Sequence, residues 1–227
     1  MSWVFLILTF LAALVEWMAV ARDWRKVEFI AKPLVIIFLL LWLVFGWGLG
    51  GGLNWFALGL FFSLIGDVIL LFPNEDRWFL FGMVAFLLTH AAYFAGLNTP
   101  PPSFNGITLG VAIMIILTAL PVVRRILQGA VNKGLTRLIV PIRIYAVLIS
   151  LMLFSALLTL FRTDWSSGAA YLLSSGAVLF LASDMLLAWE KFVQPVRRGR
   201  LLVMISYSLG QIALTSGAAL QFAHYLK

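Results

Sequence analysis

Residues 53–72 read LNWFALGLFFSLIGDVILLF, an apolar run of 20 residues in which Asp67 is the one charged side chain. An α-helix needs about 20 apolar residues to cross the hydrocarbon core of a bilayer. Backbone groups in lipid must be hydrogen-bonded within the protein, and the alternating pattern of a barrel strand is absent from this run. The stretch therefore predicts a transmembrane helix with a carboxylate five residues before its end.

Similar runs recur along the whole chain, which is 63% hydrophobic and 11% charged with a mean hydropathy of +1.05. The first run carries Glu16 and lacks a basic start, so we expect a helix rather than a cleaved signal peptide. No loop is long enough for a second domain. We therefore predict an all-α, polytopic bundle forming a single domain over residues 1–227. Its eight expected helices are 2–21, 33–47, 53–72, 78–97, 107–123, 138–161, 168–189 and 201–224.

The basic residues alternate between the two ends of the predicted bundle. Thirteen of the 16 Lys and Arg residues fall in the loops 22–32, 73–77, 124–137 and 190–200, whereas Arg162 and Lys227 fall on the opposite side. The positive-inside rule then makes these loops cytoplasmic and places both termini outside. The net charge of +7 needs no nucleic-acid partner. We expect a multi-pass protein of a bacterial inner membrane; the sequence leaves its oligomeric state open.

Three carboxylates, Glu16, Asp67 and Asp184, each lie five residues before the end of an apolar run. A charge near the bilayer centre costs roughly 2.5–3.5 kcal/mol on insertion scales, so such residues are functional candidates. Asp67 and Asp184 also share a local phrase, SLIGD over residues 63–67 and LASD over residues 181–184. We predict that this pair is functional, with Glu16 in a supporting role.

Other polar side chains reach the same inner half of the bundle, given a helical rise of 1.5 Å per residue. These candidates for substrate contact are Lys32, His90, Arg143, Tyr145, Tyr207 and Gln211. Each has a structural alternative: Arg143 could pair with Glu16, Lys32 could be an interfacial anchor, and the others could hydrogen-bond between helices. Ser63 and Ser183 are expected to pack closely or to support the carboxylates.

The spacing of these groups hints at a duplicated four-helix unit. Asp184 lies 117 residues after Asp67, and Tyr207 lies 117 residues after His90. Parallel repeats of this kind occur in membrane proteins; the alternative is a chance match of short phrases. A duplicated bundle would bring the helices of the two aspartates together, so we expect both carboxylates to line one cavity.

Two neighbouring carboxyl groups favour a state in which one is protonated and the other ionised. One site then holds a proton donor and a base, which is sufficient for hydrolysis without a metal. The same arrangement would serve proton-coupled transport of a lipid or small molecule. The residues alone leave both possibilities open.

The motifs in these helices resemble those of the lysoplasmalogenase family, called YhhN-like in bacteria. The resemblance covers nearly the whole chain and rests on Lys32-Pro33, FSLIGDVIL at 62–70, Gly82, Phe86, His90, Tyr93, Pro141, Tyr145, GAVLFLASDMLL at 176–187, Tyr207 and Gln211. One departure concerns Tyr207-Ser208, which stands where the family has a tyrosine pair.

The resemblance implies hydrolysis of the vinyl-ether bond of lysoplasmalogens to a fatty aldehyde and glycerophospho-ethanolamine or -choline. The substrate would be a lysophospholipid taken from membrane lipid. Asp67 and Asp184 would act as acid and base, no cofactor would be needed, and Lys32 and Arg143 would hold the phosphate.

A competing possibility is a zinc-dependent membrane hydrolase of the alkaline-ceramidase kind. Such a site needs several histidines, and the chain has only His90 and His224 and no cysteine. Asp67, Asp184 and His90 remain a conceivable metal set. Our expectation is nevertheless a site without metal.

Overall fold

The computed structural model describes residues 2–72 and 76–222, so His224 and Lys227 lie outside the described part. Eight helices there are long and apolar enough to cross a membrane, which confirms the predicted all-α bundle. They are α1 (Ser2–Ala21), α2 (Arg25–Trp47), α3 (Leu53–Leu70), α4 (Asp76–Leu97), α5 (Gly106–Asn132), α6 (Ile139–Leu158), α7 (Ser167–Phe192) and α8 (Gly199–Phe222). Short 3₁₀ turns, Thr136–Leu138 and Thr159–Phe161, flank α6.

Two helices are longer than expected at their polar ends. Helix α2 begins at Arg25 rather than at residue 33, so Pro33 lies inside it, and α5 continues past Arg124 to Asn132. Hydropathy marks only the part of a helix that is immersed in lipid. The backbone remains helical beyond that part, where charged side chains reach water.

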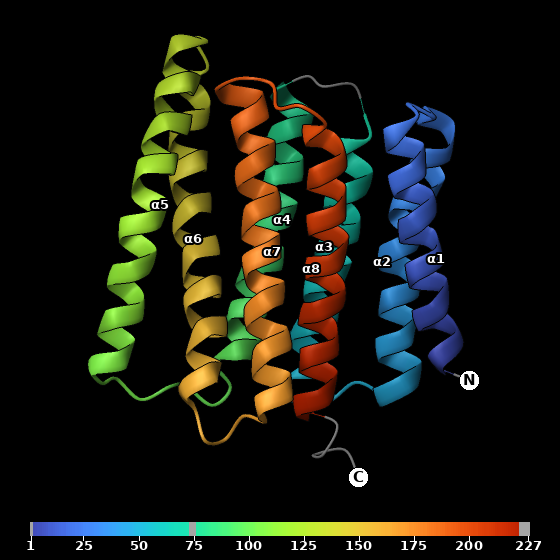
Figure 1. Cartoon of the computed structure of the whole chain (residues 1–227), viewed down its shortest axis with the longest axis vertical. Helices are drawn as coiled ribbons and strands as arrows, with labels where there is room; N and C mark the ends of the chain where they lie inside the picture. The colour runs from blue at the N-terminus through green and yellow to red at the C-terminus, as the bar shows by residue number, and fades with distance from the viewer. Residues whose placement is uncertain (1, 73–75, 223–227) are drawn as a thin grey trace.

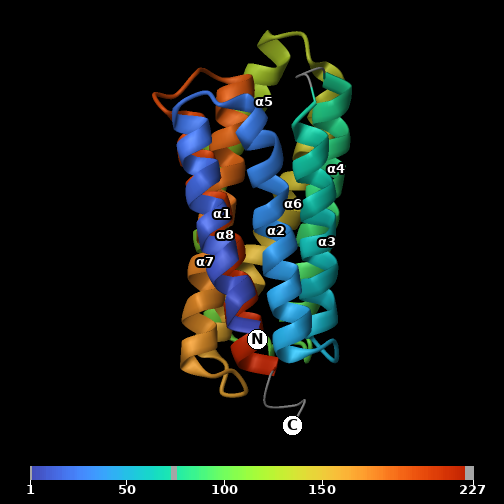
Figure 2. The ribbon, with the colours of Figure 1, turned by 90° about the vertical axis from the view of Figure 1, so that its right-hand side faces the viewer.

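The helices pack mainly as three neighbouring pairs, α1 with α2, α3 with α4, and α7 with α8 (Figures 1 and 2). Helix α8 also contacts α1, α2 and α3, while α5 lies at the periphery against α6 and α7. The expectation that the two aspartate helices, α3 and α7, are adjacent is wrong. Helix α8 lies between them, because it packs closely on α7 and also touches α3.

Glycines set the spacing within two of these pairs. Gly176 of α7 and Gly210 of α8 face each other so closely that a Cβ on Gly176 would lie 2.9 Å from the Gly210 carbonyl oxygen. In the α3–α4 pair, Gly59 makes room for the ring of Tyr93, and Gly66 makes room for Phe86. Small residues of this kind allow close helix approach in membranes. Here they also fix two aromatic rings beside the polar residues of α3.

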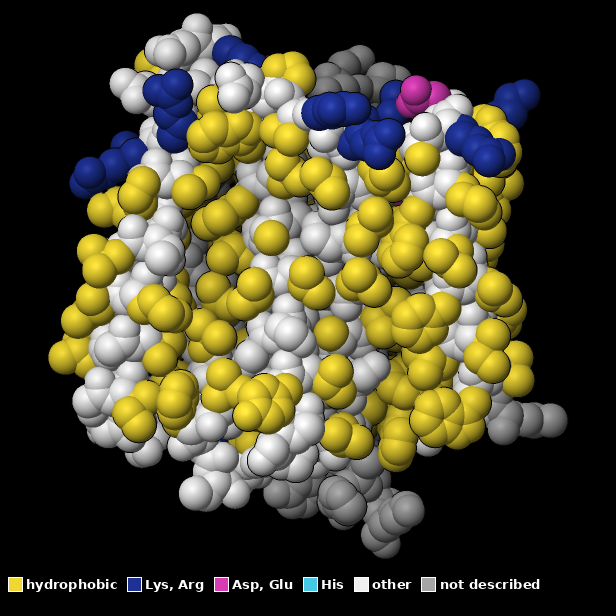
Figure 3. All heavy atoms as spheres, viewed as in Figure 1, with side chains coloured by type: hydrophobic (Ala, Val, Ile, Leu, Met, Phe, Trp, Pro, Cys, Tyr) yellow, Lys and Arg dark blue, Asp and Glu magenta, His cyan; other side chains and the backbone are white. Residues whose placement is uncertain are grey.

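Lys and Arg side chains gather at one end of the bundle, the upper edge of Figure 3, above a broad hydrophobic band. We call this the basic end; it carries the α1–α2, α5–α6 and α7–α8 connections (Figure 1). Helix α1 begins and α8 ends at the opposite end. That distribution follows the predicted alternation of charge, and the assignment of the basic end to the cytoplasm stays a prediction.

The loops at the opposite end are joined by Arg162, which follows α6. Its guanidinium donates hydrogen bonds to the Asp164 carboxylate at 2.6 and 3.0 Å and to the Pro100 carbonyl at 2.7 Å. The bonds from Arg162 lower the pKa of Asp164 below its usual value. This contact ties the α4–α5 loop to the α6–α7 loop.

Candidate active site

Asp184 of α7 accepts two hydrogen bonds through the same oxygen. Its Oδ2 lies 2.5 Å from the Tyr145 hydroxyl of α6 and 3.0 Å from Nε2 of His90 of α4. The two partners also lie 3.0 Å apart, so the three side chains form a closed triangle. The Asp184 side chain is 12% exposed, whereas His90 is fully buried. Helices α4, α6 and α7 therefore meet at the Asp184 carboxylate, whose Oδ1 takes part in neither hydrogen bond.

Asp67 of α3 has different partners. Its Oδ2 accepts a 2.7 Å hydrogen bond from the Tyr207 hydroxyl of α8, and its Oδ1 lies 3.3 Å from Nζ of Lys32 of α2. Asp67 is 1% exposed, so this ion pair is buried. Lys32 is thus neither an interfacial anchor nor open to solvent, because it neutralises a carboxylate inside the bundle.

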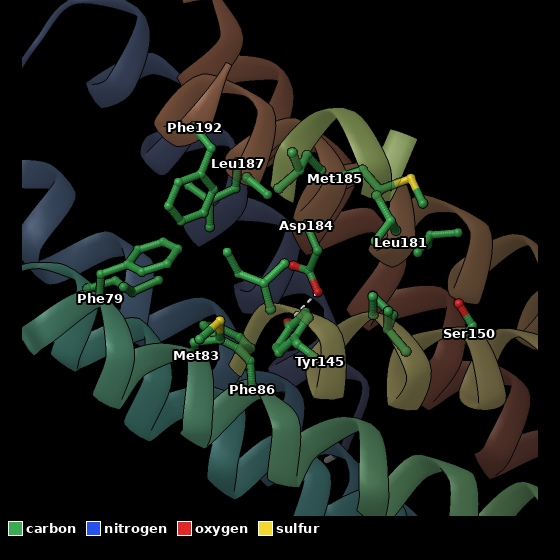
Figure 4. A pocket seen from close by; sticks show the side chains of 17 residues that line it. Phe79, Met83, Phe86, Tyr145, Ser150, Leu181, Asp184, Met185, Leu187 and Phe192 are labelled. Carbon is green, nitrogen blue, oxygen red and sulfur yellow. Dashed lines mark hydrogen bonds between the residues drawn. The ribbon is translucent and has the colours of Figure 1, made fainter. Parts of the chain in front are cut away.

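An apolar cavity between α4, α5, α6 and α7 leads to Asp184 (Figure 4). In the close-up, Asp184 and Tyr145 point toward one another within a wall of hydrophobic side chains. Further lining residues include Phe79, Met83, Phe86, Ile126, Ile142, Ile149, Leu181, Met185 and Phe192. Asp184 and Tyr145 therefore place polar groups that can take part in acid–base chemistry on the wall of a mostly apolar cavity.

The expectation that both carboxylates line one cavity is met by Asp184 but not by Asp67. The ring of Phe86 lines the cavity and packs edge-on against Tyr207 at 5.7 Å between centroids. Phe180 packs against Tyr207 at 5.4 Å and against His90 at 4.7 Å. Asp67 thus lies behind an aromatic layer, because α8 places Tyr207 between the two aspartate helices.

Gln211 of α8 connects α3 and α4 beside the aspartates. It accepts a 2.6 Å bond from the Tyr93 hydroxyl and donates a 2.7 Å bond to Ser63 Oγ. Ser63 also lies 3.1 Å from Thr89 Oγ1, so it supports Gln211 rather than a carboxylate. The residues predicted from the sequence do not include Thr89, although it lies one residue before His90. Gln211 therefore has the interhelical role that the sequence allowed.

Three other candidates lie apart from the cavity. Ser183 donates a 3.2 Å bond to the Val203 carbonyl across the α7–α8 contact. Glu16 is buried and interacts electrostatically with Lys32. Arg143 was expected to border the cavity or to pair with Glu16. It is exposed instead. Among the described residues, Arg143 does not line this cavity and forms no ion pair with Glu16.

The conceivable metal set does not come together in the described part of the chain. His90 contacts Asp184, but Asp67 faces Lys32 and Tyr207. Across residues 2–72 and 76–222, no three His, Cys, Asp or Glu side chains are grouped to hold a metal ion. The donor arrangement thus fits hydrogen bonding and proton transfer better than metal binding.

An eight-helix membrane bundle with two aspartates inside its helices, one buried and one at an apolar cavity, has the architecture of a membrane-embedded enzyme. The chain belongs to the YhhN family, whose model matches residues 27–218. The lysoplasmalogenase TMEM86B of Rattus norvegicus is 27% identical over 197 residues, covering 86% of this chain and 74% of the relative.

Relatives occur in bacteria as well. A lysoplasmalogenase of Mycobacterium tuberculosis is 27% identical over 168 residues, covering 72% of this chain and 60% of the relative. The lysoplasmalogenase TMEM86A of Bos taurus is 30% identical over 164 residues, covering 70% and 63%. No solved structure matches the chain. The predicted family is therefore confirmed, and with it the expectation of an enzyme.

Proposed function

We propose that this protein hydrolyses the vinyl-ether bond of lysoplasmalogens, giving a fatty aldehyde and glycerophospho-ethanolamine or -choline. The observation that carries this proposal is Asp184 at the wall of an apolar cavity, hydrogen-bonded by Tyr145. Such a cavity suits an alkyl chain, and its polar wall suits acid catalysis on that chain. The names of the relatives point to the same substrate class.

In the proposed reaction, Asp184 in its protonated form transfers the proton to the β-carbon of the vinyl ether. This breaks the carbon–carbon double bond and leaves an oxocarbenium ion. Water adds to the cationic carbon and loses a proton to a carboxylate base. The hemiacetal then collapses as its hydroxyl proton moves to the glycerol oxygen, releasing aldehyde and alcohol. One water is consumed for each bond cleaved, and no metal or redox step is needed.

We assign the acid role to Asp184 and the base role to Asp67. Asp184 faces the cavity, where it can reach a substrate carbon. Asp67 lies 3.3 Å from the Lys32 ammonium, and this positive charge offsets part of the cost of burying a carboxylate there. Rings of Phe86, Phe180 and Tyr207 lie between them, and aromatic faces stabilise a cation. Asp67 would act through Tyr207, whose hydroxyl it already binds.

A transporter using the same carboxylates is not favoured. The curated relatives are named as enzymes. In addition, polar groups toward the opposite end, such as Asn98, Ser155 and Ser174, are uncharged and hydrogen-bond to neighbouring helix atoms. They act as interhelical contacts rather than as a continuation of a charged path.

The proposal can be tested with the purified protein in detergent. We would supply lysoplasmenyl-ethanolamine, its 1-acyl analogue and its 1-alkyl analogue at equal concentration and measure aldehyde, fatty acid and glycerophospho-ethanolamine. Aldehyde released from the vinyl ether, with no product from the other two lipids, is the expected result. Equal cleavage of the acyl ester, or no aldehyde from the vinyl ether, would contradict it. Asp184→Asn serves as the inactive control.

A further inference from the structure

The proposed reaction consumes water, yet the cavity wall around Asp184 is mostly apolar. A different part of the bundle, where α1, α2 and α8 meet, carries charged side chains from the basic end toward Asp67. Arg200 of α8 is 41% exposed and donates 2.9 Å bonds to both oxygens of Glu28, which is 6% exposed. This series of charged side chains therefore begins at the surface with Arg200 and continues into the bundle with Glu28.

The next groups lie one helical turn deeper. Glu28 and Lys32 are four residues apart on α2, so they share a face of that helix. Val20 lines a surface pocket with the charged residues Asp23 and Arg200, and Glu16 lies four residues before Val20 on α1. Helix α2 thus leads from the surface ion pair of Arg200 and Glu28 to Lys32, and α1 leads from the surface pocket to Glu16.

Glu16 is the buried acid for which the proposed reaction has no use. It is 1% exposed, and its Oε1 has no hydrogen-bond partner in the described structure. Oδ1 of Asp67 makes no hydrogen bond either, although Lys32 Nζ lies 3.3 Å away. Glu16 interacts electrostatically with Lys32, Asp67 and Glu28. Buried carboxylate oxygens without partners are costly, and a water bridging them would satisfy both.

We propose that Glu16 and Lys32 hold a water against Asp67, and that Glu16 exchanges protons between this water and the basic end. Glu16 is then a positioning residue that acts through Asp67. The charged groups that interact with Glu16 are Lys32 and Glu28 of α2 and Asp67 of α3. Two residues of α8 bind these groups in turn, Arg200 at Glu28 and Tyr207 at Asp67. Substrate would enter from the apolar side and water from the polar side.

Protons balance over a turnover. The attacking water gives its proton to the Tyr207 hydroxyl, which passes its own proton to Asp67. Asp67 passes one proton to the bridging water, which passes one to the Glu16 carboxylate. Glu16 releases it to solvent near Glu28 and Arg200, while Asp184 takes up one proton to replace the one given to carbon. This route rests on the proposed role of Asp67. Glu16 lies outside the residues that the family model matches.

The first test compares Glu16→Gln and Glu16→Ala with Thr9→Ala, a buried polar residue on the same face of α1 whose hydroxyl bonds its own helix. We expect Glu16→Gln to lower kcat about tenfold with an unchanged KM, less than the roughly 10²–10⁴-fold of a group that exchanges a proton with the substrate itself. Formate should restore turnover to Glu16→Ala, whereas chloride at equal ionic strength should not. Thr9→Ala should keep wild-type turnover. Wild-type kcat in Glu16→Gln, or loss without formate rescue, would overturn the proposal.

The second test does not depend on activity. At a mildly acidic pH, where Glu16 holds a proton, infrared spectra of the wild type should contain a protonated-carboxyl band that Glu16→Gln lacks, and this band should shift promptly on transfer into D₂O. A band that persists unshifted would show that water does not reach Glu16. If the wild type released no aldehyde while the band still exchanged, the proposed function would fail and the water route would stand.

Discussion

The Tyr207 hydroxyl of α8 binds Asp67 of α3, while His90 of α4 binds Asp184 of α7. Asp184 lies 117 residues after Asp67, and Tyr207 lies 117 residues after His90. Asp67 and His90 therefore belong to the first half of the chain, and the equivalent positions Asp184 and Tyr207 belong to the second. Each half therefore supplies one aspartate and the partner for the other half's aspartate. Removing either partner should disturb one carboxylate and leave the other in place.

Tyr145→Phe tests the support of Asp184. This change removes the 2.5 Å donor to Oδ2 and leaves the ring that lines the cavity. We expect kcat to fall about 2- to 12-fold, in line with the loss of one hydrogen bond worth about 0.5–1.5 kcal/mol, with little change in melting temperature. Tyr171→Phe, at an exposed position of α7, is the matched control. An unchanged kcat would separate Tyr145 from the chemistry.

Lys32 and Arg143 should behave differently, although both were expected to hold the phosphate. Lys32→Met leaves Asp67 buried without a cation, a change that costs about 3–5 kcal/mol in buried ion pairs. We expect a lower melting temperature and greatly reduced turnover. Arg143→Ala, at an exposed position, should alter neither. Thermal unfolding and steady-state kinetics in detergent would check both; a large KM increase in Arg143→Ala would restore its phosphate role.

Gln211→Leu tests the network behind the aspartates. The change removes the acceptor of the buried Tyr93 hydroxyl, and an unsatisfied buried group costs about 1–3 kcal/mol. Ser63 loses its Gln211 donor but keeps Thr89 as a partner. Unfolding should therefore occur at a lower temperature. A melting temperature equal to that of the wild type would mean that the network contributes little to stability.

Single cysteines can test the orientation of the basic end, because the chain has none of its own. Asn132→Cys lies at the end of α5 on the basic side, and Thr163→Cys lies in the α6–α7 loop at the opposite end. In intact cells, a membrane-impermeant maleimide should label Thr163→Cys, and Asn132→Cys only after permeabilisation. The reverse pattern would place the basic end outside the cytoplasm.

Removal of divalent ions should leave activity intact. Asp184 is hydrogen-bonded by Tyr145 and His90, and Asp67 contacts Tyr207 and Lys32. These contacts suit proton transfer. Turnover before and after dialysis against EDTA is the measurement. Loss that a divalent ion restores would require a metal in the mechanism.

The sequence predicts the depth of side chains better than their direction. A 1.5 Å rise per residue placed Asp67 and Tyr207 at similar depths, and the two side chains are hydrogen-bonded. Lys32 lies deeper than the helix mouth expected for it, because α2 begins at Arg25 rather than at residue 33. Arg143 and Tyr145 are also close in depth, but two residues turn an α-helix by about 200°, so they face opposite sides. Tyr145 binds Asp184 and Arg143 is exposed. This distinction could have been drawn from helical periodicity alone.

The neighbours of each helix were harder to foresee. Two similar aspartate phrases indicate a relationship between α3 and α7, but they do not say which helix lies between them. The close α7–α8 contact at Gly176 and Gly210 decides that order, because it holds α8 against α7 and on the side facing α3. The hydrogen bond from Tyr207 to Asp67 follows from this packing rather than from any single motif.

The most direct test of the account is the turnover of Asp184→Asn and Asp67→Asn on lysoplasmenyl-ethanolamine. Asparagine keeps the size of the side chain and removes its proton and charge. If the pair acts as acid and base, each change should lower aldehyde release by roughly 10²–10⁴, with KM nearly unchanged and the protein still folded. Near-wild-type aldehyde release by either well-folded variant would remove that aspartate from the mechanism.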